Sequence, residues 1–111
     1  MSDFVLIRVN CPSSRDAHRI AEAMIEARLA ACANVEGPIQ SIYEWDGEVQ
    51  REYEFILWLK APADNWTEID KQVDELHPHD TPAIIAIPCV HANARYSAWV
   101  KDTTNNLSNT P

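Results

Sequence analysis

The sequence is short of basic side chains, and this shortage limits its possible partners. Nine lysine and arginine residues stand against 17 acidic residues in 111, which gives a formal net charge of −8 at pH 7. Binding to nucleic acid needs a basic face that neutralises phosphates, so nucleic acid is not an expected partner. The acidic balance instead favours solubility and attracts cations.

Glycine and long apolar runs are also scarce. The two glycines form no glycine-rich loop that could hold a phosphate, so nucleotide binding gains no support. No apolar run approaches the ~20 residues of a membrane helix. No basic segment followed by an apolar stretch marks a signal peptide at the N-terminus. We therefore expect a cytoplasmic protein without membrane contacts.

Cysteine occurs three times, with no CxxC spacing. An odd count without that spacing speaks against a disulfide scaffold and suits a reducing compartment. Cys32 and Cys89 lie in apolar contexts and are expected to be packing residues. Cys11 precedes an expected helix, whose dipole can lower the pKa of the thiol. It is therefore either a ligand or nucleophile, or a small buried apolar residue.

The apolar pattern predicts one domain with the order strand, helix, strand, strand, helix, strand. Strands are expected at residues 4–10, 48–60 and 83–90, and a further strand region begins at residue 32, is interrupted by Gly37-Pro38 and resumes over residues 39–45. The helical patterns cover residues 17–29 and 66–76. This order is typical of the α+β, ferredoxin-like βαββαβ arrangement, an antiparallel sheet with two helices on one face. Residues 1–102 form the expected domain, including a short helical cluster at Tyr96, Trp99 and Val100. Residues 103–111 read as a polar, frayed tail.

The middle of the chain predicts a long hairpin. Asp46-Gly47 is a strong turn signal, and the strand after it far exceeds the usual ~5–6 residues. Both faces of that strand carry bulky apolar groups: Tyr53, Phe55, Leu57 and Leu59 on one, Ile56 and Trp58 beside Glu54 and Lys60 on the other. Such a strand either contacts another subunit or is buried on both sides within one domain.

The loop after the second helix carries several side chains that could bind a metal or take part in catalysis. It reads His77-Pro78-His79-Asp80-Thr81-Pro82, and its prolines stiffen the backbone. Imidazole together with a thiol suits copper or zinc, or nucleophilic chemistry. His77 could equally cap the carbonyl end of the helix.

Several short motifs spread along the chain form a distinctive set. These are Cys11-Pro12-Ser13, Arg28-Leu29-Ala30-Ala31-Cys32-Ala33-Asn34, Ser41-Ile42-Tyr43-Glu44-Trp45-Asp46-Gly47, Tyr53-Glu54, Leu59-Lys60, His77-Pro78, Thr81-Pro82 and Tyr96-Ser97-Ala98-Trp99. Together they resemble the CutA proteins, the divalent-cation tolerance family; the motifs follow the family order and span most of residues 4–100. The resemblance implies a ferredoxin-like subunit in a tight homotrimer, with the long hairpin reaching across subunit boundaries.

The resemblance also implies a link to copper and other divalent cations. Cys11 matches a thiol proposed to bind copper, and His77 matches the His-Pro motif. Members commonly read HPYExPE here, whereas this chain has His79 in place of tyrosine, Asp80 in place of glutamate and Ala83 in place of glutamate. The loop has lost a phenol and a carboxylate but has gained an imidazole, itself a possible ligand.

We therefore predict a cytoplasmic, non-catalytic homotrimer involved in copper tolerance, with neither organic cofactor nor nucleic-acid partner. Copper(II) or another divalent metal would bind weakly through Cys11, His77, His79 and Asp80. The predicted trimer interface comprises Tyr43, Trp45, Glu54, Trp58, Tyr96 and Trp99, since aromatic residues are enriched at interfaces. The alternatives are a small-molecule sensor resembling the trimeric PII proteins, and an enzyme with Cys11 as nucleophile and His77 as base.

Overall fold

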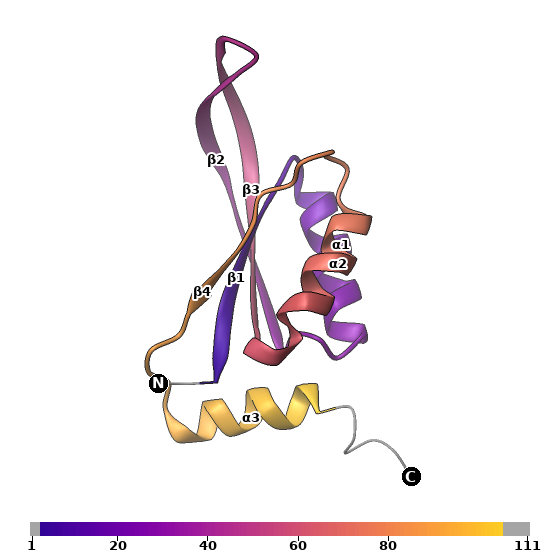
Figure 1. Ribbon diagram of the computed structural model, residues 1–111, viewed down its shortest axis with the longest axis vertical. Coiled ribbons are helices and arrows are strands. Elements are labelled where there is room, and N and C mark those ends of the chain that lie inside the picture. Colours follow the sequence, from indigo (N-terminus) through magenta and orange to yellow (C-terminus); the bar gives the residue numbers. More distant parts are fainter. Residues whose placement is uncertain (1–2, 106–111) are drawn as a thin grey trace.

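The structure, a computed structural model, describes residues 3–105. Its elements are β1 (Phe4–Cys11), α1 (Ser14–Glu26), β2 (Cys32–Trp45), β3 (Glu48–Pro62), a 3-10 turn (Ala63–Asn65), α2 (Trp66–Leu76), β4 (Ile84–Pro88) and α3 (Ala94–Thr104). The sheet has the order β2-β3-β1-β4, and all neighbouring strands are antiparallel. α1 and α2 lie on one face of it (Figure 1). The predicted ferredoxin-like arrangement is confirmed.

The N-terminal end of α1 is capped by a serine side chain. The side chain of Ser13 accepts a hydrogen bond from the backbone N–H of Asp16, which satisfies a donor of the first turn. The helix ends at Glu26, and Arg28 then adopts a left-handed φ of 59°. Its apolar stripe, which includes Ile20 and Met24, packs against the sheet and is fully buried.

β3 is the central long strand, and its side chains alternate between two environments. Leu57 and Leu59 belong to the core between the sheet and the helices. Ile56 and Trp58 point to the other face, which α1 and α2 leave uncovered. The alternation therefore follows the sequence pattern, and one sheet face remains open over part of its length.

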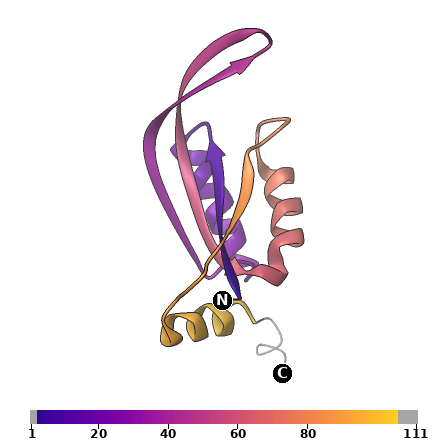
Figure 2. The same cartoon turned by 60° about the vertical axis from the view of Figure 1, so that its left-hand side comes forward.

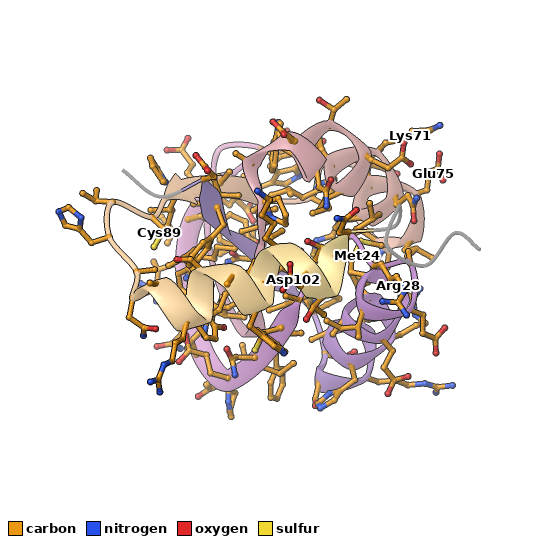
Figure 3. The ribbon with its side chains drawn as sticks, turned by 90° about the horizontal axis from the view of Figure 1, so that it is seen from below. Met24, Arg28, Lys71, Glu75, Cys89 and Asp102 are labelled. Atoms are coloured by element: carbon orange, nitrogen blue, oxygen red, sulfur yellow. The ribbon has the colours of Figure 1, made fainter. Side chains whose placement is uncertain are left out.

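α3 covers one end of that open face. Figure 3 shows it lying across the lower end of the sheet. Val100 packs there with Phe4 and Ala31. α3 is longer than the cluster expected from sequence and reaches Thr104, which is buried and donates a hydrogen bond to the carbonyl of Val100. Ordered structure thus continues past residue 102, and residues 106–111 of the expected tail lie outside the described residues.

The hairpin formed by β2 and β3 extends beyond the body as an arm, residues 39–54 (Figures 1 and 2). An irregularity between Glu36 and Ile39 marks its base, where the Gly37–Pro38 peptide bond is cis. Asp46 and Gly47 both have positive φ, as the predicted two-residue turn requires. The arm gives the molecule its longest dimension, 52 Å.

Candidate functional site

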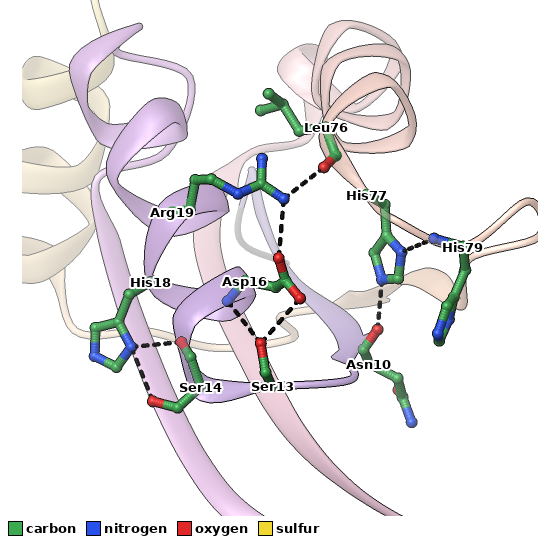
Figure 4. Close-up of polar contacts among 9 residues, drawn as sticks. All are labelled: Asn10, Ser13, Ser14, Asp16, His18, Arg19, Leu76, His77 and His79. Carbon is green, nitrogen blue, oxygen red and sulfur yellow. Dashed lines mark hydrogen bonds and ion pairs between the residues drawn. The ribbon is translucent and has the colours of Figure 1, made fainter.

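The loop of residues 77–83 is attached to the end of β1 through His77. The Nε2 atom of His77 lies 2.7 Å from the carbonyl oxygen of Asn10, and Nδ1 lies 3.1 Å from the backbone N of His79 (Figure 4). A backbone N–H can only donate, so Nδ1 accepts and Nε2 carries the proton that is donated to Asn10. Both ring nitrogens of this buried, neutral imidazole are therefore engaged.

The other end of the loop is attached to the same strand residue. The backbone N–H of Asn10 donates to the carbonyl of Ala83, at 3.2 Å. His77 has an extended ψ of 139°, as a residue before proline prefers. His79 and Asp80 are exposed between these two attachments. The loop is thus closed at both ends against β1 and presents its polar side chains outward.

His79 and Asp80 line a broad cavity of about 1060 Å³ between the loop, β1 and the arm. Glu52 and Glu54 of β3 line the same cavity, opposite Ser41 and Ile39 of β2. Sequence reasoning did not single out Glu52. Its spacing from Glu54 places both carboxylates on one strand face and would have identified it.

Two of these carboxylates already have neighbours in the cavity. The buried Glu54 carboxylate lies 3.4 Å from the side-chain nitrogen of Asn10. A hydrogen bond with Glu52 raises the pKa of Tyr43. Arg8 also lines the cavity and donates to the side-chain oxygen of Asn10. The cavity therefore combines one imidazole, three carboxylates and one guanidinium.

Cys11 belongs to a different environment, the core between sheet and helices. Its exposed fraction is 0%, and burial, together with the nearby Asp16 and Glu54 carboxylates, raises its pKa to about 11. The expected lowering by the helix dipole is wrong because desolvation of the thiolate outweighs it. At pH 7 roughly 1 thiol in 10⁴ is ionised. Cys11 thus packs as a small apolar residue.

The four predicted metal ligands do not converge. His79 and Asp80 line the cavity, whereas Cys11 is in the core and both nitrogens of His77 are engaged. Within residues 3–105, no three His, Cys, Asp or Glu side chains come close enough together to hold a metal ion. One chain thus supplies His79 and Asp80 as accessible donors, and the carboxylates of Glu52 and Glu54 line the same cavity.

The predicted interface residue Trp58 lies on the open face of the sheet. Its indole N–H donates to the carboxylate of Glu36, at 2.6 Å. The guanidinium of Arg8, directly across from it in β1, lies 5.8 Å from the centre of the indole ring. Trp58 is therefore half-buried and lies between a carboxylate and a guanidinium.

The remaining predicted interface aromatics lie at the two extremes of the molecule. Tyr43 and Trp45 are exposed on the arm. Tyr96 of α3 contacts the ring of Trp99, at 5.6 Å, and the ammonium group of Lys60 lies over its face. Trp99 itself is 46% exposed. Their role in assembly stays a prediction.

None of the helices within residues 3–105 has the length and apolar character needed to cross a bilayer.

Comparison with known proteins identifies relatives along nearly the whole chain. The family model described as CutA1 divalent ion tolerance protein matches residues 5–103. The Divalent-cation tolerance protein CutA of Thermus thermophilus is 38% identical over 94% of this chain and 99% of its own length. Protein CutA of Mus musculus is 36% identical over 91% of this chain, which spans only 57% of that longer relative.

Solved structures agree in fold. The divalent ion tolerance protein CutA1 of Ehrlichia chaffeensis superposes with a TM-score of 0.89 at 36% identity, covering 94% of this chain and 97% of the other. CutA1 of the psychrotrophic Shewanella sp. SIB1 gives 0.91 at 32% identity, covering 95% and 98%. Sequence identity at this level over nearly the full length, together with the shared fold and motifs, shows that the chain belongs to the CutA1 divalent ion tolerance family.

Proposed function

We propose that this chain acts in divalent-cation tolerance as a non-catalytic cytoplasmic homotrimer that binds copper(II) or a similar divalent metal weakly. The observation that supports the binding role best is the cavity that His79 and Asp80 of the loop line together with Glu52 and Glu54 of β3. These side chains supply imidazole and carboxylate donors to a cation, and the net charge of −8 favours its approach.

The donor set favours copper(II) over copper(I). Imidazole and carboxylate suit Cu(II), Zn(II) and Ni(II), whereas Cu(I) prefers thiolate and thioether. The Cys11 thiol is buried and protonated, so it offers no soft ligand to this cavity. Binding is expected to be weak because one chain holds only part of a ligand set. Water or a second copy of the chain would complete it.

The trimer is supported by the apolar surface of a single chain. Ile85 and Ile87 of the edge strand β4 are 50% and 38% exposed. Their partners in β1 are Arg8 and Leu6, so both isoleucines lie on the open sheet face beside Trp58. Association would remove these side chains from water, and that is the main driving force for stable oligomers.

A non-catalytic role is favoured over a thiol enzyme. A nucleophilic cysteine needs a thiolate and a base within hydrogen-bond reach. Cys11 is protonated, and the ring of His77 is engaged by backbone groups on both sides. The alternative of a sensor resembling PII proteins gains no support, since the matched family and the relatives named above carry CutA names.

A cytoplasmic location is part of the proposal, and the odd cysteine count supports it because reduced thiols suit that compartment. The solved structure of the relative from Archaeoglobus fulgidus is titled periplasmic. Cell fractionation of the source organism with an antibody against the chain tests the assignment. Recovery in the periplasmic fraction would contradict it.

The central experiment is a copper(II) titration of the tag-free full chain, followed by native mass spectrometry and calorimetry. We expect a mass near 37.8 kDa, from three chains of 12.6 kDa, with one copper per chain. His79→Phe should weaken binding at least about tenfold, and Cys11→Ala should leave it unchanged. His91→Phe, at another exposed histidine, serves as the control. A protein that takes up no copper(II) would overturn the metal-binding role.

A further inference from the structure

His77 is buried, whereas His79, two residues along the same loop, is exposed. We propose that His77 is a positioning residue and not a metal ligand: its imidazole joins the backbone of β1 to the backbone of His79 and so fixes where His79 and Asp80 lie in the cavity. This inference rests on the proposed function, because it assigns His77 a role toward the same metal.

The first step in the argument is the occupation of the ring. Nε2 donates to the carbonyl of Asn10 at 2.7 Å, and Nδ1 accepts from the N–H of His79 at 3.1 Å. Only 7% of His77 is exposed to solvent. A metal at either nitrogen would displace one of these bonds and leave a backbone group of Asn10 or His79 without this partner, which is unfavourable.

The second step is the identity of the atoms that His77 connects. Both ends of the loop are hydrogen-bonded to the backbone of Asn10, since its carbonyl accepts from His77 and its N–H donates to Ala83. The side chain of Asn10 lines the cavity and approaches Glu54. The residue that anchors the loop is thus itself part of the cavity wall, and the position of the loop relative to Glu54 depends on this connection.

The third step is the direct contact between the two histidines. The ring centroids of His77 and His79 are 4.9 Å apart, and the planes are inclined by 50° (Figure 4). His77 therefore restrains His79 through the backbone hydrogen bond and through ring packing. Groups that orient a ligand in this way usually change metal affinity about 10–100-fold when they are removed.

Three variants of the full chain separate positioning from ligation. His77→Phe keeps the ring volume but removes both hydrogen bonds. His77→Gln keeps an acceptor for the N–H of His79 and a donor for the carbonyl of Asn10. His91→Phe removes an exposed imidazole elsewhere and serves as the matched control. Thermal unfolding followed by circular dichroism confirms that each variant is folded before binding is measured.

The metal readout combines calorimetry with pulsed electron paramagnetic resonance of bound copper(II), which counts coordinated imidazoles. We expect His77→Phe to weaken binding about 10–100-fold and His77→Gln to stay within about threefold of the parent. The number of coordinated imidazoles should be the same in all His77 variants and should fall only in His79→Phe. Loss of one imidazole in His77→Phe would make His77 a ligand and overturn the inference, as would unchanged affinity in that variant.

A metal-free readout separates failure of this inference from failure of the proposed function. Amide hydrogen exchange should show the His79 N–H protected in the parent and in His77→Gln, and exposed in His77→Phe. If copper(II) does not bind but this difference is seen, the proposed metal role fails while the positioning of the loop by His77 stands. If the His79 amide exchanges equally in all three proteins, the positioning role is overturned whatever the metal does.

Discussion

Asn10 and Cys11 are consecutive residues of β1 whose side chains point to opposite faces of the sheet. Asn10 faces the cavity, where its side chain contacts those of Arg8 and Glu54. Cys11 faces the core, where desolvation raises its pKa by more than the charge of Arg19 lowers it. Two neighbouring residues of one strand therefore have opposite environments, a polar cavity for Asn10 and the buried apolar core for Cys11.

Cys11 should react slowly with alkylating reagents at neutral pH. Its raised pKa of about 11 leaves few thiolates, and the buried sulfur is inaccessible until the structure opens. We expect iodoacetamide at pH 7 to modify Cys11 at least about tenfold more slowly in native protein than in guanidinium-denatured protein. Mass spectrometry of quenched peptides measures both rates. Rapid, selective labelling of native Cys11 would contradict this description of the site.

Asp16 should stabilise the fold in a pH-dependent way. Hydrogen bonds from Ser13 and Arg19 hold the pKa of its carboxyl below the ordinary value of 3.8. The stabilisation is therefore present above pH 4 and is lost as the pH falls through the lowered pKa. Asp16→Asn should cost about 0.5–1 kcal/mol at pH 7, since the charge lies in the first turn of α1.

Urea unfolding at pH 7 and pH 3, at equal protein concentration, measures this effect. The stability difference between the parent and Asp16→Asn should shrink at pH 3. Asp70→Asn, at an exposed position in α2, is the matched control and should change stability little at either pH. An undiminished difference at pH 3 would show that the charge of Asp16 is not the stabilising feature.

At the scale of elements, β3 serves two parts of the molecule. Its C-terminal half supplies Leu57 and Leu59 to the core, and its N-terminal half forms one strand of the exposed arm. The change occurs at the irregularity between Glu36 and Ile39 of β2. Such an interruption bends a strand and increases its twist, which fits the curved arm in Figure 2.

Gly37 should be intolerant of any side chain, because it lies at this junction with a φ of 141°. A Cβ atom there would approach Cδ2 of Phe55 to 2.9 Å and the carbonyl oxygen of Glu54 to 3.0 Å. Gly37→Ala should therefore destabilise the protein by about 2 kcal/mol or more. Gly47→Ala, at a positive φ with open space around it, should cost only about 1 kcal/mol. Thermal unfolding compares the two variants, and equal losses would contradict the steric argument.

At the scale of the whole molecule, a single chain exposes large apolar side chains in two places, on the open sheet face and on the arm. The open sheet face presents Ile85, Ile87 and Trp58, and the arm presents Ile42 and Trp45 far from the core. The arm has only two strands and no layer packed on it, and two-stranded hairpins are marginally stable alone in water. Contacts with other copies would supply the missing layer.

Trp58→Glu should therefore split the proposed trimer. The substitution places a second carboxylate beside Glu36 on the open face, which would have to be desolvated on association. Native mass spectrometry and light scattering should show a shift from about 37.8 kDa toward the 12.6 kDa chain. Thr67→Glu adds the same charge at an exposed position of α2 and should leave the assembly intact. An intact trimer in Trp58→Glu would remove this face from the interface.

The architecture can be predicted from the amino-acid sequence alone, because local patterns and turn chemistry agree with one another. The alternation in β3, the stripe of α1 that includes Ile20 and Met24, and the Asp46-Gly47 turn each predict their element. The ends of two helices were misjudged: α1 ends at Glu26 although its apolar pattern continues to residue 29, and α3 continues to Thr104. Thr104 looks like part of a polar tail, but its hydroxyl bonds within the helix and its side chain is buried.

The chemistry of the candidate ligands, in contrast, depends on tertiary contacts. The sequence places Cys11, His77, His79 and Asp80 in two short segments, and their residue types are equally suited to a metal. Burial then raises the pKa of Cys11, and backbone hydrogen bonds engage both nitrogens of His77, which leaves His79 and Asp80 facing the cavity. Solvation and hydrogen-bond partners come from segments distant in the sequence, so local patterns do not encode them.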